Sequence, residues 1–184
     1  MYLQALGKYL DHKQEMGELD GVYGYGRDVL LHFARWMALH ERPYLERPEQ
    51  LEFPTETWAA QDMRKSEVFS DAVRHAAADD ERARFRERAE FFYTYSISTL
   101  TAMPTRMLAR PLVVLLSHGF RRAYVEEHPD ERAPAPAQAW TDPPLPATFV
   151  PQKARVKRRL IAAASVCAVA ALVILAWMIA TVAR

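Results

Sequence analysis

The sequence LIAAASVCAVAALVILAWMIATVA occupies residues 160–183 and contains no charged side chain. At about 1.5 Å per residue, a helix of this length extends about 36 Å, whereas the hydrocarbon core of a bilayer is about 30 Å thick. A helix pairs every backbone N–H and C=O group within one segment, as lipid requires. Trp177 lies near the distal end, where an indole ring suits the membrane interface. The sequence therefore predicts one transmembrane helix over residues 160–183.

The charges that flank this segment predict its orientation. Only Arg184 follows the segment, whereas five cations precede it: Lys153, Arg155, Lys157, Arg158 and Arg159. Positive flanks stay on the cytoplasmic side, so we expect a cytoplasmic N-terminus and an extracytoplasmic C-terminus. Residues 1–20 have no continuous apolar core and do not resemble a secretory signal. The pattern is typical of a single-pass, tail-anchored protein, with the lipid bilayer as its first partner and anionic headgroups near the basic flank.

Composition divides the rest of the chain. Seven prolines fall between residues 129 and 151 and favour an extended, semi-rigid spacer. We therefore expect a head over residues 1–128, a Pro-rich linker over 129–152 and a basic flank over 153–159. The head carries 17 Lys and Arg against 20 Asp and Glu, a net charge of −3, which argues against nucleic acid as a partner.

Hydrophobic periodicity predicts an all-α head of about five to six helices, with no strand-like alternation of useful length. Apolar residues at helical spacing mark a helix over residues 2–16, and a second helix ends before Pro43. Thr55 and Ser66 are the expected N-caps of two further helices. A long helix begins near Asp79 and ends before Pro104, and a last one begins near Pro111.

One candidate ligand-binding segment reads DGVYGYGRD over residues 20–28. Its glycines favour a loop, and tyrosines beside Asp and Arg side chains can stack on a sugar ring and bind its hydroxyl groups. The glycine spacing does not match a dinucleotide-binding loop. The alternative is an interhelical turn whose tyrosines cover the core. The candidate residues are Asp20, Tyr23, Tyr25, Arg27 and Asp28.

The second candidate segment reads PTETWAAQDMRK over residues 54–65. Glu56 and Asp62 are the candidate catalytic residues, as an acid/base pair, if the chain is an enzyme. Trp58, Gln61 and Arg64 are the candidate ligand-binding residues. In the alternative interpretation Thr55 caps a helix, Trp58 lies in the core and Arg64 forms a surface pair.

The sequence offers little support for disulfide, metal, phosphate-binding or nucleophilic chemistry. Cys167 is the single cysteine, so an intrachain disulfide and a cysteine-based zinc site are excluded. The six histidines show no pairing at metal-ligand spacing except His128, which follows Glu126 and Glu127 at the edge of the linker, and there is no phosphate-binding loop or nucleophile elbow. We expect no metal and no cofactor.

The two segments together resemble a known architecture. A Gly-Tyr-Gly-Arg-Asp stretch that enters a helix with His32 and Trp36, followed by Pro-Thr-Glu-Thr-Trp, resembles the helical hairpins of (α/α)-toroid carbohydrate-active proteins. The resemblance covers residues 3–78 and implies aromatic and acidic residues on loops at one rim. It also implies that the chain corresponds to the C-terminal part of such a toroid.

These features favour binding over turnover. The leading hypothesis is a tail-anchored protein whose cytoplasmic head is a binding or accessory module, with a protein partner or a role in glycan assembly. The alternative is a C-terminal fragment of a toroid glycan-processing enzyme. If the head binds a glycan, Tyr23, Tyr25 and Trp58 are expected to form one aromatic patch beside Glu56 and Asp62.

Overall fold

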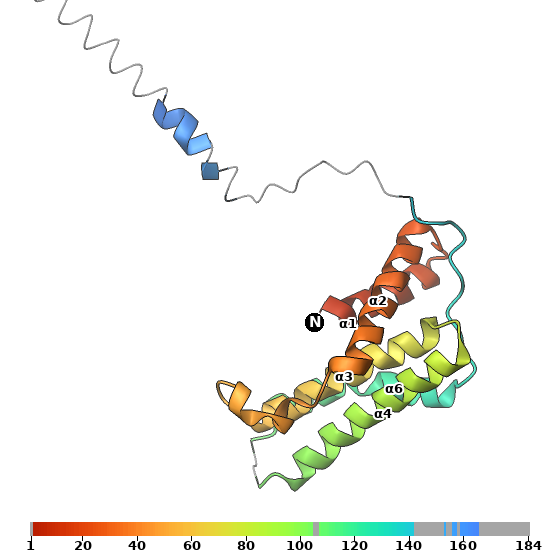
Figure 1. Ribbon diagram of the computed structural model, residues 1–184, viewed down its shortest axis with the longest axis vertical. Coiled ribbons are helices and arrows are strands. Elements are labelled where there is room, and N and C mark those ends of the chain that lie inside the picture. Colours follow the sequence, from red (N-terminus) through yellow and green to blue (C-terminus); the bar gives the residue numbers. More distant parts are fainter. Residues whose placement is uncertain (1, 105–106, 142–152, 154–155, 158, 166–184) are drawn as a thin grey trace, which may run out of the picture. The chain divides into compact units, whose positions relative to one another are not determined.

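The computed structural model describes residues 2–104, 107–141, 153, 156–157 and 159–165 (Figure 1). The chain divides into two compact units, Met1–Thr141 and Asp142–Arg184. The described residues of the first unit contain six α-helices, two short 3₁₀ helices and no strand. The helices are α1 (Tyr2–Glu15), α2 (Gly21–His40), η1 (Tyr44–Glu46), η2 (Pro48–Gln50), α3 (Glu56–His75), α4 (Asp79–Ala102), α5 (Ala109–His118) and α6 (Phe120–Glu127). The prediction of an all-α fold is confirmed.

Helix α3 is the centre of the head. It contacts all five other α-helices, and α4 packs along it as its main neighbour (Figure 1). Every residue from Lys65 to His75 is buried, so this part of α3 has no face toward solvent. A helix that is buried all round is normally apolar, yet this one carries Glu67, Asp71 and Arg74. Their charges therefore have to be compensated by neighbouring helices.

The apolar core has two clusters. The larger joins α1, α2, α3 and α4, and at its centre the rings of Phe69 and Phe92 stack with centroids 5.9 Å apart. The smaller cluster lies toward the N-terminal end of α3, where Ala60 and Met63 pack against Leu100 and Val114. The Ser66 hydroxyl donates to the carbonyl of Ala89 at 2.8 Å and ties α3 to α4 between the clusters.

Three predicted helix boundaries were wrong. Ser66 does not cap a helix, because one helix runs through it and its hydroxyl bonds to α4 instead. Residues 21–26 are the first turns of α2 and not a loop, since the Asp20 side chain accepts from the Tyr23 amide and caps the helix there. The last predicted helix divides into α5 and α6 at Gly119.

Residues 129–141, which we call the strap, lie against the head. The strap amides of Ala133 and Ala137 donate to the carbonyls of Arg74 and Leu19, at 2.8 and 2.7 Å. The first compact unit therefore extends to Thr141. The proline content had predicted that the head ends earlier, at residue 128. Proline removes backbone donors but leaves carbonyls free to accept, and the strap uses this property in its contacts with the helices.

Two glycines of α2 leave room for the strap. A Cβ atom at Gly21 would lie 3.0 Å from the carbonyl oxygen of Ala139, and one at Gly24 would lie 3.2 Å from the Pro136 ring. These glycines are helical, so what they provide is close approach of another backbone and not a turn.

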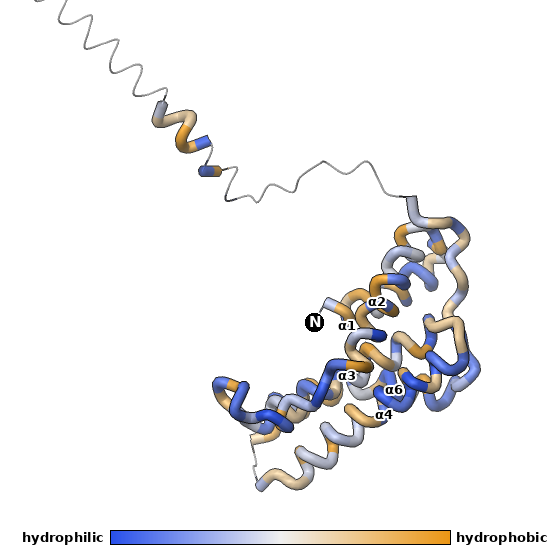
Figure 2. Tube along the Cα trace, in the orientation of Figure 1, coloured by the Kyte–Doolittle hydropathy of each residue, from blue (hydrophilic) through white to orange (hydrophobic). Residues whose placement is uncertain are grey.

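The predicted transmembrane helix falls mostly outside the described residues. Residues 160–165, at its start, are helical. Within the part of the chain that the structure describes, no helix is both long and apolar enough to cross a membrane. Figure 2 agrees, because hydrophilic and hydrophobic residues alternate along the described helices. Of the basic flank, Lys153, Lys157 and Arg159 are described, whereas Arg155 and Arg158 lie outside the described residues.

Candidate functional site

The candidate residues of segment 20–28 are held by the head itself. Asp20 caps α2 and accepts from the Lys13 ammonium group at 2.8 Å, and these two hydrogen bonds lower its pKa. Arg27 lies 3.6 Å from the carboxylate of its neighbour Asp28. Neither aspartate joins an aromatic binding surface, because one is a cap and the other is an exposed partner of the adjacent arginine.

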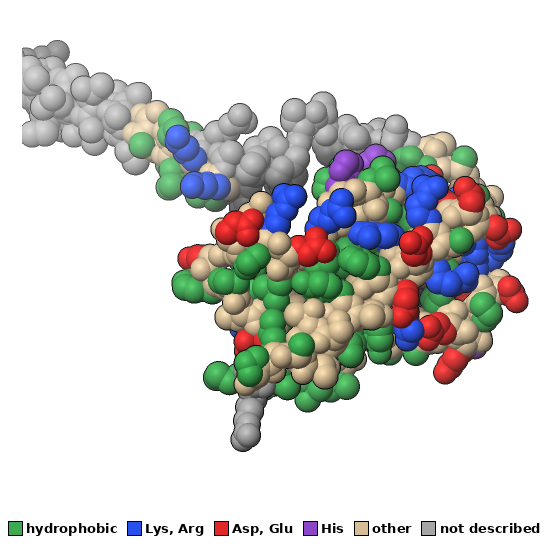
Figure 3. All heavy atoms as spheres, turned by 60° about the horizontal axis from the view of Figure 1, so that its bottom comes forward, with side chains coloured by type: hydrophobic (Ala, Val, Ile, Leu, Met, Phe, Trp, Pro, Cys, Tyr) green, Lys and Arg blue, Asp and Glu red, His purple; other side chains and the backbone are tan. Residues whose placement is uncertain are grey.

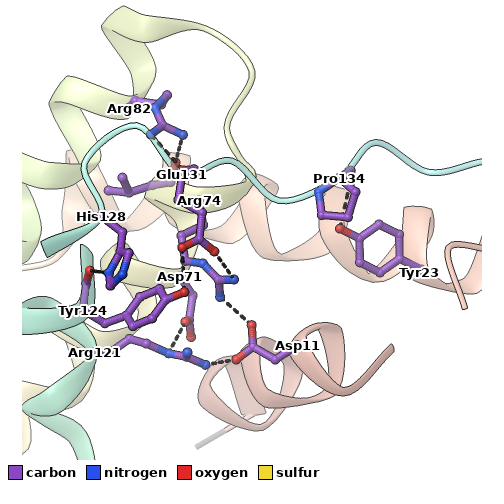
Figure 4. Close-up of polar contacts among 11 residues, drawn as sticks. Asp11, Tyr23, Asp71, Arg74, Arg82, Arg121, Tyr124, His128, Glu131 and Pro134 are labelled. Carbon is purple, nitrogen blue, oxygen red and sulfur yellow. Dashed lines mark hydrogen bonds and ion pairs between the residues drawn. The ribbon is translucent and has the colours of Figure 1, made fainter. Parts of the chain in front are cut away.

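The two tyrosines of this segment contact the strap. Tyr23 is fully buried, and its hydroxyl donates to the carbonyl of Pro134 at 2.9 Å (Figure 4). The Tyr25 ring stacks on Trp140, with centroids 4.8 Å apart. Aromatic residues do gather at this end of the head, but the strap already occupies part of their surface: Tyr23 is buried, whereas Tyr25 keeps 49% of its surface exposed. The interpretation of these tyrosines as packing residues is therefore correct for Tyr23.

An ionic cluster lies beside the strap at the C-terminal end of α3. Figure 4 shows Arg74 and Arg121 converging on Asp11 from two different helices. Arg74 pairs with Asp11 at 2.5 Å and with Glu131 of the strap at 3.0 Å, while Arg121 pairs with Asp11 and, at 2.7 Å, with Asp71. Each arginine thus pairs with two carboxylates, one of which the two share, and the cluster joins α1, α3, α6 and the strap.

Asp71 is the most deeply buried acid of this cluster. Burial raises its pKa to about 7, against the opposing effect of the Arg121 guanidinium group. Helix α1 comes close to it only because residue 7 is glycine, since a Cβ there would overlap the Asp71 carboxylate. One turn earlier on α3, the Glu67 carboxylate lies 2.5 Å from Nδ1 of His118. Arg64 donates to the Nε2 atom of that ring, so Nδ1 carries the proton and donates to Glu67.

Arg82 also joins the strap to the C-terminal end of α3. It is buried, and its guanidinium group donates to the Val73 carbonyl of α3 at 2.8 Å and to two strap carbonyls, those of Pro129 and Glu131, at 2.9 and 3.1 Å. Three neutral acceptors satisfy the donors without neutralising the charge, and burial lowers the pKa of Arg82 accordingly.

An open cleft of about 550 Å³, which we call the Trp58 cleft, lies at the opposite end of α3. Three aromatic rings and a set of polar side chains line it: Tyr44, Phe53, Trp58, Glu52, Thr55, Thr57, Gln61 and Arg110. The rings of Tyr44 and Trp58 lie 5.1 Å apart. Trp58 is half-buried, and its indole N–H donates to the Phe53 carbonyl at 2.8 Å. That bond fixes the ring, which can then offer its face to a ligand.

The expected catalytic pair does not come together. Glu56 and Asp62 lie six positions apart on α3, which places them about 120° apart around the axis and about 9 Å apart along it. The Asp62 carboxylate is fully buried, accepts from the Tyr44 amide at 3.2 Å and lies 3.1 Å from the Lys65 ammonium group. Burial raises its pKa to about 6, opposed by Lys65. Asp62 therefore anchors η1 to α3, and neither acid lines the cleft.

The single aromatic patch expected from the sequence is not formed. Tyr23 lies beside His75 at the last residue of α3, with ring centroids 6.2 Å apart, whereas Trp58 lies in the first turn of the same helix. His75 and Trp58 are seventeen residues apart along α3, a distance of about 25 Å, so the Tyr23 ring lies far from the Trp58 ring. Arg64 also turns away from the cleft, toward His118. Of the predicted ligand-binding residues, Trp58 and Gln61 line the Trp58 cleft.

Sequence reasoning missed several residues of both sites. Tyr44, Phe53 and Arg110 line the cleft from three separate segments, and their spacing carries no signal. The acidic residues of α3 did carry a signal in the sequence. Glu67 and Asp71 are one helical turn apart, and each is followed directly by a buried apolar residue, Val68 or Ala72. No group of histidines, cysteines and acids able to hold a metal occurs among the described residues.

Comparison with known protein families, with curated proteins and with solved structures found no match to this chain.

Proposed function

We propose that the chain is a membrane-tethered binding module, with residues 160–183 as the tether and the Trp58 cleft as the ligand site. The observation that carries the proposal is the contrast between the two aromatic surfaces of the head. Tyr23 is buried beneath the strap and Tyr25 stacks on Trp140 of the strap, although 49% of Tyr25 stays exposed, whereas Trp58 lines an open cleft with no strap residue in its lining. A concave site with aromatic walls and a few polar groups is the usual form of a small-molecule site.

The lining of the cleft favours a saccharide as the ligand. A sugar ring presents C–H groups on one face, which stack on an aromatic ring, and hydroxyl groups around its edge. The fixed Trp58 ring supplies the first contact, and the Gln61 amide and the threonine hydroxyls at positions 55 and 57 are suited to the second. A protein partner remains part of the proposal as the wider assembly that a tethered module serves.

The geometry favours binding over catalysis. The buried Asp62 is held by Lys65 and by the Tyr44 amide, and it does not face the cleft. A general acid or base has to reach the reacting group within hydrogen-bond distance, directly or through one water. The alternative of a toroid enzyme fragment rests on the sequence resemblance, and no contact among the described residues favours it over binding.

The ligand site can be tested by tryptophan fluorescence in the full chain. We expect short oligosaccharides of glucose or of N-acetylglucosamine to quench the emission, because a sugar stacked on Trp58 excludes water from the indole. Trp58→Phe should abolish the response and Gln61→Ala should weaken it. Trp36→Phe is the matched control, since Trp36 is an exposed indole on α2. Absence of quenching by every sugar, or an equal response in Trp58→Phe, would overturn the saccharide proposal.

The tether is tested separately. We expect the full chain to stay with membranes during alkaline carbonate extraction, and a chain that lacks residues 160–184 to become soluble with its helical circular dichroism intact. A reporter placed after Arg184 should lie outside the cytoplasm, and one placed before Met1 inside. Release of the full chain by carbonate would contradict the tether and leave the saccharide test unaffected.

A further inference from the structure

The stretch of residues 91–125 contains no aspartate or glutamate, although residues 1–128 carry twenty acids in all. The same stretch carries four arginines. Two of them are used internally, because Arg121 pairs with Asp11 and Asp71, and Arg122 pairs with Glu90 and Glu126. Arg110 is exposed at the start of α5. The surface of α5 therefore combines positive charge with an absence of acids on its own segment.

Helix α5 is apolar on its outer as well as its inner side. Pro111 and Val114 are buried, and Val114 belongs to the smaller core cluster. The outward residues of α5, together with Leu108 before it and Phe120 at the start of α6, are also apolar and are exposed: Leu108 by 39%, Leu112 by 54%, Val113 by 64%, Leu116 by 73% and Phe120 by 52%. We call these five residues the α5 face. Figure 3 shows hydrophobic side chains gathered over one part of the head's surface, while charged side chains crowd another. A helix that is apolar all round normally has a cover on every side.

We propose that the α5 face lies in the headgroup region of an anionic lipid bilayer. An apolar face that is free of acids and flanked by arginine is the pattern of a helix lying in a membrane interface. Leu112 and Leu116 lie four residues apart on α5, so they form one stripe that can enter the lipid together. Arg110, at the N-terminal end of the stripe, is placed to meet lipid phosphates.

The charge pattern favours lipid over a second copy of the chain. A protein surface that pairs with another protein usually carries both signs of charge around its apolar centre. The α5 face itself contains no charged residue and has the exposed Arg110 near one end, which suits a partner with an apolar interior and a negatively charged surface. The proposal rests on the proposed tether for its bilayer. The 18 residues between Thr141 and Leu160 can span at most about 60 Å, so they allow the head to reach the surface.

The experiment uses the full chain with Cys167→Ser and one new cysteine that carries an environment-sensitive fluorophore. Leu116→Cys places the dye on the α5 face. Leu39→Cys is the matched control, because Leu39 is 69% exposed on α2, close to the 73% of Leu116, but lies two residues before Glu41 and outside the acid-free stretch. The vesicles contain phosphatidylcholine alone or with phosphatidylglycerol, and brominated lipid serves as the quencher.

We expect the dye at position 116 to shift to the blue and to be quenched by brominated lipid, more strongly with phosphatidylglycerol than without it. The dye at position 39 should respond to neither change. Arg110→Ala should weaken the effect of phosphatidylglycerol by about fivefold, because one cation near the surface is lost. No response at position 116, or an equal response at position 39, would overturn the proposal. A dye shielded from iodide but not quenched by brominated lipid would assign the face to a second copy and would overturn it too.

Failure of this inference and failure of the proposed function give different results. Carbonate extraction reports on the tether, and oligosaccharide quenching reports on the Trp58 cleft. If the chain does not insert, the labelled protein is added to preformed vesicles. Quenching at position 116 then still supports the α5 face, and its absence still overturns it.

Discussion

The two ends of α3 carry similar side chains but differ in what covers them. At the C-terminal end, Tyr23, Arg74 and Arg82 contact the strap through hydrogen bonds and ion pairs. At the N-terminal end, Trp58 and Gln61 line an open cleft. Aromatic rings beside charged groups are therefore a covered structural joint in one place and an accessible site in the other. The two ends differ because the chain after α6, as the strap, lies against the C-terminal end of α3. Their local composition does not explain the difference.

The largest expected effect breaks the covered end. Arg74→Ala removes the buried cation that Asp11 and Glu131 share, which leaves Glu131 without this ion pair and Asp11 with Arg121 alone, so we expect the free energy of unfolding to fall by about 3–5 kcal/mol. Arg110→Ala is the control at the open end, where the side chain is exposed and the change should stay within about 0.5 kcal/mol. Urea denaturation followed by circular dichroism measures both. Equal losses would show that the two ends do not differ as described.

A smaller effect comes from removal of the strap. A chain that ends at Thr141 keeps every strap contact, whereas one that ends at His128 loses the acceptors of Arg82, the partner of the Tyr23 hydroxyl and the ion pair of Glu131. Each hydrogen bond contributes about 1 kcal/mol, and the freed strap regains conformational entropy. The shorter chain should therefore be less stable by about 2–4 kcal/mol in urea denaturation. If both chains unfold at the same urea concentration, the strap does not belong to the fold.

The pH dependence of stability sharpens the comparison further. Because burial raises the pKa of Asp71 to about 7 in the folded state, the folded protein retains a proton there that the unfolded chain releases near pH 4. The Asp71 contribution is therefore fully present below about pH 4 and is lost as the pH rises to about 7, at up to about 1.4 kcal/mol per pH unit. Asp71→Asn removes this loss.

We expect the free energy of unfolding of Asp71→Asn to fall less with increasing pH than that of the parent between about pH 4 and 7. His75 acts in the opposite direction, since burial lowers its pKa to about 4 and its contribution rises with pH up to about 6.5. His75 is unchanged in both proteins, so their difference isolates Asp71. Parallel pH profiles in urea denaturation would show that Asp71 is ionised in the folded protein.

The smallest stability effect is expected at the open end. Gln61 is half-buried in the wall of the cleft, so Gln61→Ala should change the free energy of unfolding by less than about 0.5 kcal/mol. The same variant should bind oligosaccharide more weakly. A large loss of stability would indicate that Gln61 holds the fold, as the residues under the strap do.

Periodicity was enough to predict the class of the fold and several helices. The long helix from Asp79 was found because three acids open it and Pro104 follows its end. The break predicted over residues 17–26 was too long, because glycine was interpreted as flexibility. At Gly21 and Gly24 glycine instead makes room for a segment more than a hundred residues away. A single sequence carries no local signal of such an approach.

The candidate sites were predicted only in part for a related reason. Trp58 and Gln61 were found because they lie in one segment, whereas Tyr44 and Arg110 join them from segments that only the fold brings near. The proline-rich stretch was interpreted as a spacer because prolines lack donors. Prolines still have carbonyl oxygens that accept hydrogen bonds, and the strap uses them. Its carbonyls at Pro129 and Pro134 accept from Arg82 and Tyr23.

The position of the strap also determines how the head responds to mechanical force. A pull on the chain beyond Thr141 reaches the stack of Trp140 on Tyr25 first, then the Ala137 amide, and only afterwards the contacts of Glu131 and Pro129. Because these contacts follow one another along the strap, a pull that lifts the strap from its C-terminal end would meet them in this order. Its thirteen residues supply about 40 Å of extended chain before tension reaches α6. Under such a pull the strap would lengthen before the helices carry load.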